Sequence, residues 1–397
     1  MTEKHLEILD LALPYLFPPF SSPLERPSRR YSTLLKLSLV SRSIHSHLQP
    51  ILYSEVFISC GNSQLTPLLK TLTSNESLTR QIRKLSFVSR HKQVEKWSLD
   101  HLERIFEQCT GLRELVIAIP TTFGLKENFL SSKSLANLAS LTLATPIRPS
   151  ISAPPKPPLF NLTTLSILPP FDSSFTLSFT PTLNILLAPR PSLQSEETMC
   201  SLSKLVNLSL SDSHRHPLKL PPSLAPNVSS TLESLALPRY THSHSYASTL
   251  QGEVGIQEPT EQSRFSCDPP IPVHPSRKFL DHFSWKSVKS KLKYVYLANL
   301  GHLGTIHHLP KSVKVLVIGP SSLKEERELE ELKSCLCNTK AELEEVEVLL
   351  RRRREGKKEG DSKEEIEKSR RIENDLRRIE KDVSEKGNGC RVAVKWV

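Results

Sequence analysis

The sequence contains little glycine and few aromatic residues. Of its 397 residues 12 are Gly, and Phe, Trp and Tyr together make up 6%. Loops that hold phosphate groups depend on glycine, and no G-x-G-x-x-G, Walker A or G-x-S-x-G motif occurs. Proline, in contrast, occurs 31 times. This composition indicates stiff loops, and because the sequence offers no catalytic constellation we expect a protein that is not an enzyme.

Cysteine pairs at C-x-x-C spacing are also missing. The chain has seven cysteines, and an odd number without a disulfide or metal-ligand pattern is typical of a reducing compartment. No run approaches the roughly 18 apolar residues of a membrane span, and the first residues do not resemble a signal peptide. Paired histidines such as His45 and His47 lie near no cysteine pair. We therefore expect a cytoplasmic or nuclear protein with no cofactor, no metal and no membrane partner.

Acidic residues are outnumbered by basic ones, so the formal net charge is +11. A basic excess can favour nucleic acid or an acidic protein partner. No patch of interleaved basic and aromatic residues accompanies this charge. Nucleic acid is therefore an alternative, and we do not expect it to be the main partner.

A short apolar motif, L-x-x-L-x-L or close to it, recurs along residues 59–320. Several successive copies lie 24 to 30 residues apart, which is the period of leucine-rich repeats. Each copy predicts a short strand with alternating buried side chains, and stacked strands share one core. We therefore predict an α/β fold with an irregular leucine-rich-repeat solenoid here, and a generic parallel-strand α/β body is the alternative. The central residues of the eight copies are Leu85, Leu115, Leu141, Leu165, Leu208, Leu235, Val295 and Leu316.

The stretch LLKLSLVSRSIHSHLQPILYSEVFI, residues 34–58, predicts a helix followed by a strand. Apolar residues at three- and four-residue steps predict one helical stripe, formed by Leu34, Leu37, Val40, Ile44 and Leu48. Pro50 lacks an amide proton, so we expect the helix to end there. A short amphipathic helix does not bury its apolar face alone. The stripe therefore packs on an upstream helix, which Leu6, Leu9, Leu13 and Leu16 predict, on the following domain, or on another protein.

This stretch resembles the second half of an F-box as it occurs in fungal F-box-like proteins. The resemblance lies in two motifs, L-x-x-L-x-x-V-S-R-x-I from Leu34 to Ile44 and L-x-P-x-L-Y-x-x-V from Leu48 to Val56. It implies a short F-box-like helical module over residues 1–58. Such a module binds the Skp adaptor, and through it the cullin scaffold, of an SCF-type ubiquitin ligase. By this resemblance the partner-binding residues are Leu9, Leu13, Leu34, Leu37 and Val40.

The resemblance implies a non-catalytic function, in which the repeats hold a protein substrate close to the ligase. Two alternatives stay open. In the first, the N-terminal helices only cap the repeats, and the protein is an interaction scaffold without a ligase link. In the second, it is a basic nuclear protein that binds nucleic acid, which predicts a steep salt dependence of binding.

The composition changes after residue 320. Residues 321–389 contain 18 Lys plus Arg and 20 Asp plus Glu. Leucine and valine recur there at helical spacing, with a glycine-containing break at residues 351–361. We predict a charged helical hairpin over residues 321–389, inserted before a terminal strand at residues 390–397.

Overall fold

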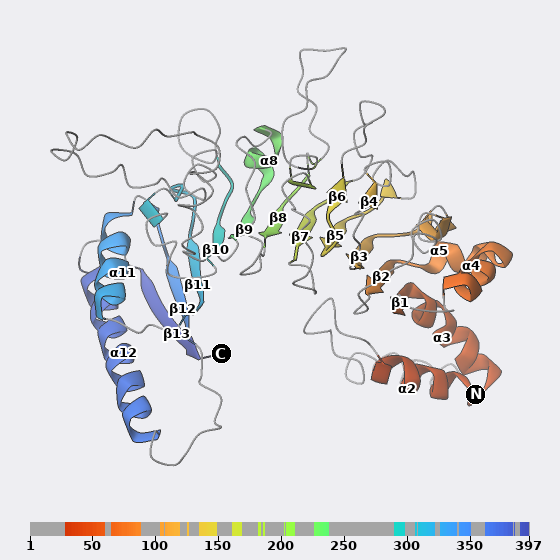
Figure 1. Cartoon of the computed structure of the whole chain (residues 1–397), viewed down its shortest axis with the longest axis horizontal. Coiled ribbons are helices and arrows are strands. Elements are labelled where there is room, and N and C mark those ends of the chain that lie inside the picture. The colour runs from red at the N-terminus through yellow and green to blue at the C-terminus, as the bar shows by residue number, and fades with distance from the viewer. Residues whose placement is uncertain are drawn as a thin grey trace, which may run out of the picture. The chain divides into compact units, whose positions relative to one another are not determined.

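The computed structural model describes part of the chain. Described residues are 28–59, 65–88, 104–106, 108–119, 125–126, 135–148, 161–168, 182–183, 186, 202, 204–210, 226–237, 290–297, 306–307, 309–321, 326–339, 341–350, 362–383, 385 and 390–396. The chain divides into two compact units, Met1–Leu232 and Glu233–Val397. Each unit combines helices with parallel strands (Figure 1), so the fold class is α/β, as predicted.

The first unit starts, in its described part, with helices α2 (Ser28–Ser38) and α3 (Arg42–Ser54). Helix α3 runs directly into strand β1 (Glu55–Ser59). The elements that follow in this unit are α4 (Leu65–Ser74), α5 (Glu76–Gln81), β2 (Lys84–Val88), β3 (Glu114–Ala118), β4 (Leu125–Lys126), β5 (Ser140–Leu143), β6 (Ile147–Arg148), β7 (Thr164–Ile167), β8 (Asn207–Leu210) and α8 (Pro226–Thr231).

Six of the described strands of this unit form a parallel sheet in the order β1-β2-β3-β5-β7-β8. The central residues of the apolar motif stand side by side in it, for example Leu85 beside Leu115 and Leu115 beside Leu141. These residues are buried, because alternate residues of a strand point to the same face. The sequence motif therefore fixes the register of this sheet.

Two patterns of hydrogen bonds link neighbouring strands. The carbonyl oxygen of Arg83, just before β2, accepts from the amides of both Arg113 and Glu114 at 2.8 and 2.9 Å. The hydroxyl of buried Thr145 accepts from the amide of Ile119 at 2.9 Å and donates to its carbonyl at 2.8 Å. These bonds satisfy backbone groups that would otherwise be buried without a partner. The same carbonyl pattern recurs at Arg113, Ala139, Thr163, Glu233, Lys293 and Lys314.

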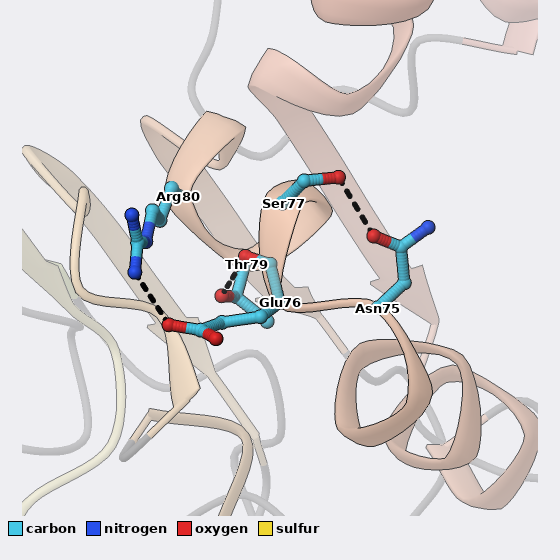
Figure 2. Close-up of polar contacts among 5 residues, drawn as sticks. All are labelled: Asn75, Glu76, Ser77, Thr79 and Arg80. Carbon is cyan, nitrogen blue, oxygen red and sulfur yellow. Dashed lines mark hydrogen bonds and ion pairs between the residues drawn. The ribbon is translucent and has the colours of Figure 1, made fainter.

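Helix α5 is held by local polar contacts and by a close backbone approach. Figure 2 shows Arg80 paired with Glu76 one turn earlier (2.5 Å) and the Ser77 hydroxyl donating to Asn75 (2.7 Å). A Cβ atom at Gly111 would lie 2.5 Å from the carbonyl oxygen of Arg80. Only glycine therefore fits where the chain passes the end of α5 before β3.

The second unit contains five parallel strands with two helices beside them. Its described strands pair in the order β9-β10-β11-β12-β13. Figure 1 shows α11 and α12 side by side along β11 to β13, and Lys333 of α11 pairs with Asp382 of α12 at 2.6 Å. The elements are β9 (Ser234–Leu237), β10 (Tyr294–Leu297), β11 (Val315–Ser321), α11 (Glu326–Asn338), β12 (Glu345–Leu350), α12 (Ser362–Val383) and β13 (Arg391–Trp396).

The prediction of a helical hairpin over residues 321–389 is wrong in its middle. Between the two helices the chain forms β12, where Glu and Val alternate and the β-branched Val346 and Val348 are buried. The period of two residues and the β-branched side chains favour a strand. Leu343, Val346 and Val348 in fact form a further copy of the apolar motif, in register with β11. The predicted terminal strand is confirmed as β13.

The prediction of one helix over residues 34–48 that ends at Pro50 is also wrong. The helix is interrupted after Ser38 and restarts at Arg42, and Pro50 lies inside α3. The proline removes one helical hydrogen bond. Ile51 and Leu52 beyond it still pack against the buried residues of the helical pair. This packing compensates for the bond that is lost.

Candidate partner-binding site

Helices α2 and α3 are separate because Ser41 starts a new helix. Ser41 has extended backbone angles, and its hydroxyl accepts from the amide of Ile44 at 3.2 Å. This is the geometry of a helix N-cap. The turn before it is closed by the amide of Leu39, which donates to the carbonyl of Leu35 at 3.2 Å, and by that of Val40, which donates to Leu37 at 3.1 Å.

The two helices bury one shared apolar cluster. Leu34 from α2 packs with Ile44 and Leu48 from α3, and all three are buried. Leu37 and Leu52 pack against this cluster and are partly buried. Part of the predicted stripe is therefore used inside the helical pair, where each helix covers the apolar face of the other.

The interruption turns another set of apolar side chains outward. Leu35, Leu39 and Val40 are 53%, 84% and 68% exposed. Among the described residues, Tyr294 in the second unit is the one other large hydrophobic side chain that is exposed. We call Leu35, Leu39 and Val40 the apolar knob. Exposed apolar side chains gathered in this way mark interaction sites more often than single ones do.

The structure separates the five residues that the sequence singled out. Leu9 and Leu13 lie outside the described residues. Leu34 is enclosed in the helical pair, Leu37 is partly buried and Val40 is exposed. The structure thus brings Leu34 and Leu37 into one cluster and places Val40 outside it.

The sequence reasoning did not name Leu35 or Leu39 among the partner-binding residues. Leu35 lies in the last turn of α2, and Leu39 directly follows the helix, with its amide donating to the carbonyl of Leu35. The signal that could have found them is Ser41, a good N-cap residue in the middle of the presumed helix. A helix break at Ser41 moves Val40 out of the stripe and leaves Leu35 and Leu39 without a neighbouring turn to cover them.

The helical pair is joined firmly to the sheet. The amide of Arg83 donates to the carbonyl of Ser54 at the end of α3 (2.8 Å). In the first strands Lys84 lies between two carboxylates, at 2.9 Å from Glu55 and 3.6 Å from Glu114. These contacts lie where the chain passes from α3 into β1 and where β1 meets the neighbouring strands. A partner bound to α2 and α3 would therefore be held next to the start of the sheet.

The sheet face opposite the leucine core is buried at β2, β3 and β5 but more accessible at β7, β8 and β10, with each unit considered by itself. In the first unit Ser86, Val116 and Thr142 stand in one row of the register and are buried. In the second unit β10 presents Tyr294, which is exposed, and Tyr296, which is partly buried. Aromatic side chains are enriched in protein interfaces. The face of β10 is thus both accessible and aromatic.

In the described part of the chain, no three His, Cys, Asp or Glu side chains lie close enough to hold a metal ion. Burial raises the pKa of Cys109 to about 12 and, with the nearby Glu331, that of Cys335 to about 11. A thiol that keeps its proton is a poor nucleophile. None of the described helices combines the length and apolar composition needed to cross a membrane.

Comparison with known proteins gave no family for this chain. No protein-family model matches it, and no curated protein is significantly similar to it in sequence.

Proposed function

We propose that this protein is a non-catalytic adaptor of the F-box type. In this proposal α2 and α3 dock on the Skp adaptor of a cullin-based (SCF) ubiquitin ligase, and the strand-rich remainder, an irregular leucine-rich-repeat body, binds a protein substrate. The observation that carries the proposal is the apolar knob, three exposed apolar side chains on a helical pair that leads directly into a parallel sheet. The motifs that resemble an F-box lie in this same stretch of sequence.

The in-register apolar motif supports the repeat part of the proposal. The central residues of neighbouring copies pair with each other in parallel strands, as in Leu141 with Leu165 and Val295 with Leu316. Stacked units of this kind expose a row of strands to a partner. The mechanism is proximity, since the adaptor raises the local concentration of substrate at the ligase and makes or breaks no bond itself.

Two other functions use parts of the same observations. An interaction scaffold would have the same knob and the same sheet but would not bind a Skp adaptor. A nucleic-acid-binding protein would use the net charge of +11, and its affinity would fall steeply with salt. Binding to the Skp adaptor is the property that separates the proposal from both.

The test is co-expression of the full chain with a Skp adaptor, with a purification tag on one partner only. We expect a stable complex, and we expect Leu39→Ser with Val40→Ser to reduce co-purification by about tenfold or more, because burying a Leu or Val side chain contributes about 1.5–3 kcal/mol. Tyr294→Ala is the matched control, since it truncates an exposed hydrophobic side chain away from the knob.

The knob variant is compared with the unchanged chain by circular dichroism, so that loss of binding is not confused with loss of folding. A folded knob variant that co-purifies like the unchanged chain would remove the knob from the docking surface. Absence of any complex with the unchanged chain would favour the scaffold.

A further inference from the structure

The helical pair has an unusual charge. The sequences of α2, α3 and the turn between them, residues 28–54, contain Arg29, Arg30, Lys36 and Arg42 and no Asp or Glu. Lys36 and Arg42 are exposed. They flank the knob directly in sequence, since Lys36 follows Leu35 and Arg42 comes two residues after Val40.

By comparison, Lys84 and Lys314 elsewhere in the described chain lie beside carboxylates. Lys84 lies between Glu55 and Glu114. Lys314 lies 3.3 Å from Glu344 and 3.4 Å from Glu342, and hydrogen bonds to these carboxylates raise its pKa. Neither Lys36 nor Arg42 forms an ion pair with a described residue. The cations beside the knob are thus available to a partner.

From this combination we infer that the surface which receives the knob is an apolar cleft on a protein, rimmed by carboxylates. The inference rests on the proposed function and specifies the partner surface at that site. The cleft buries Leu35, Leu39 and Val40, and its rim faces Lys36 and Arg42. A complementary rim speeds association and rejects partners with a neutral or basic surface.

An anionic membrane surface would also attract apolar and basic groups. The small size of the knob argues against membrane binding. Its three side chains contain about eleven aliphatic carbons, fewer than a single myristoyl chain, which on its own binds membranes only marginally. The other apolar residues of α2, Leu34 and Leu37, face α3 and do not extend the knob. A protein cleft that encloses the side chains on several sides makes better use of so small an apolar area.

The inference is tested by measuring association and dissociation rates of the full chain with the purified Skp adaptor at several salt concentrations. We expect Kd to rise about tenfold between about 0.05 and about 0.5 M NaCl, because salt screens charges at an interface rim. We expect Lys36→Glu with Arg42→Glu to slow association about tenfold at the lower salt concentration. The matched control is Lys70→Glu with Lys204→Glu, the same charge change at two exposed residues outside the helical pair; its association rate should stay within about twofold.

The outcomes separate this inference from the proposed function. Binding that is insensitive to salt and unchanged by Lys36→Glu with Arg42→Glu would overturn the acidic rim and leave the Skp adaptor as the partner. No binding at any salt concentration would overturn both. Binding to vesicles of phosphatidylcholine and phosphatidylserine, without binding to the adaptor, would replace the protein cleft by a membrane surface. Circular dichroism confirms that each variant is folded.

Discussion

Leu34 and Leu39 are leucines of the same short segment, yet their side chains have opposite surroundings. Leu34 is 1% exposed and Leu39 is 84% exposed. Residues five apart on a helical path point about 140° away from each other, so Leu39 faces away from the side of α2 on which Leu34 packs against α3. At the scale of single residues, helical spacing alone identified the members of the internal cluster. The exposed residues required knowledge of where the helix breaks.

Cys109 gives a prediction for the dependence of stability on pH. Burial raises the pKa of its thiol to about 12, whereas an ordinary thiol ionises near 9.0. When the pH rises above the ordinary value, the unfolded chain loses this proton first, so the unfolded state is favoured and stability falls. We expect the unchanged protein to lose about 1 kcal/mol more than Cys109→Ala between about pH 8 and about pH 10.

The measurement is the free energy of unfolding by urea at each pH for both proteins. Cys109→Ala is the reference for the unchanged protein, because the two proteins share every other titrating group. Two curves that run parallel over this range would contradict a proton held on Cys109 by burial.

At the scale of elements, the start of α3 depends on Ser41. Replacing Ser41 by Ala removes the acceptor for the amide of Ile44, and we expect the free energy of unfolding to fall by about 1 kcal/mol. Ser41→Asp should retain most of the stability, since a carboxylate also caps a helix N-terminus. Ser43→Ala, an exposed serine in the first turn of α3, is the control and should change stability by less than about 0.5 kcal/mol. Equal losses from Ser41→Ala and Ser43→Ala would show that the cap does not stabilise this helix.

The strands could be predicted from the sequence better than the helices. Each copy of the apolar motif marks a strand by its alternation, and neither burial nor register depends on a partner outside the sheet. The segment around Val346 and Val348 was misread, because Leu343, Val346 and Leu350 also fit a helical spacing. Its true period of two residues is visible only between Glu345 and Leu350. Short apolar runs of this kind fit both periods, and the neighbouring strand β11 decides between them.

At the scale of the whole chain, positive charges are balanced by nearby carboxylates in some segments and not in others. The sheets place Lys84 and Lys314 beside glutamates, while residues 28–54 carry only basic charges. The sequence predicted a basic protein and a parallel α/β fold. It did not predict the apolar knob, because the exposure of Leu35 and Leu39 depends on how α2 and α3 pack against each other. The proposed docking surface is thus a property of the folded helical pair.

The claim that the apolar knob is the docking surface is tested most directly by hydrogen exchange of backbone amides, measured with and without purified Skp adaptor. The account predicts slower exchange in residues 35–45 of the complex, because bound side chains there restrict opening of the turn between α2 and α3. Strands β3, β5 and β7 should exchange at unchanged rates. Unchanged exchange in residues 35–45, together with protection of those strands, would contradict the account.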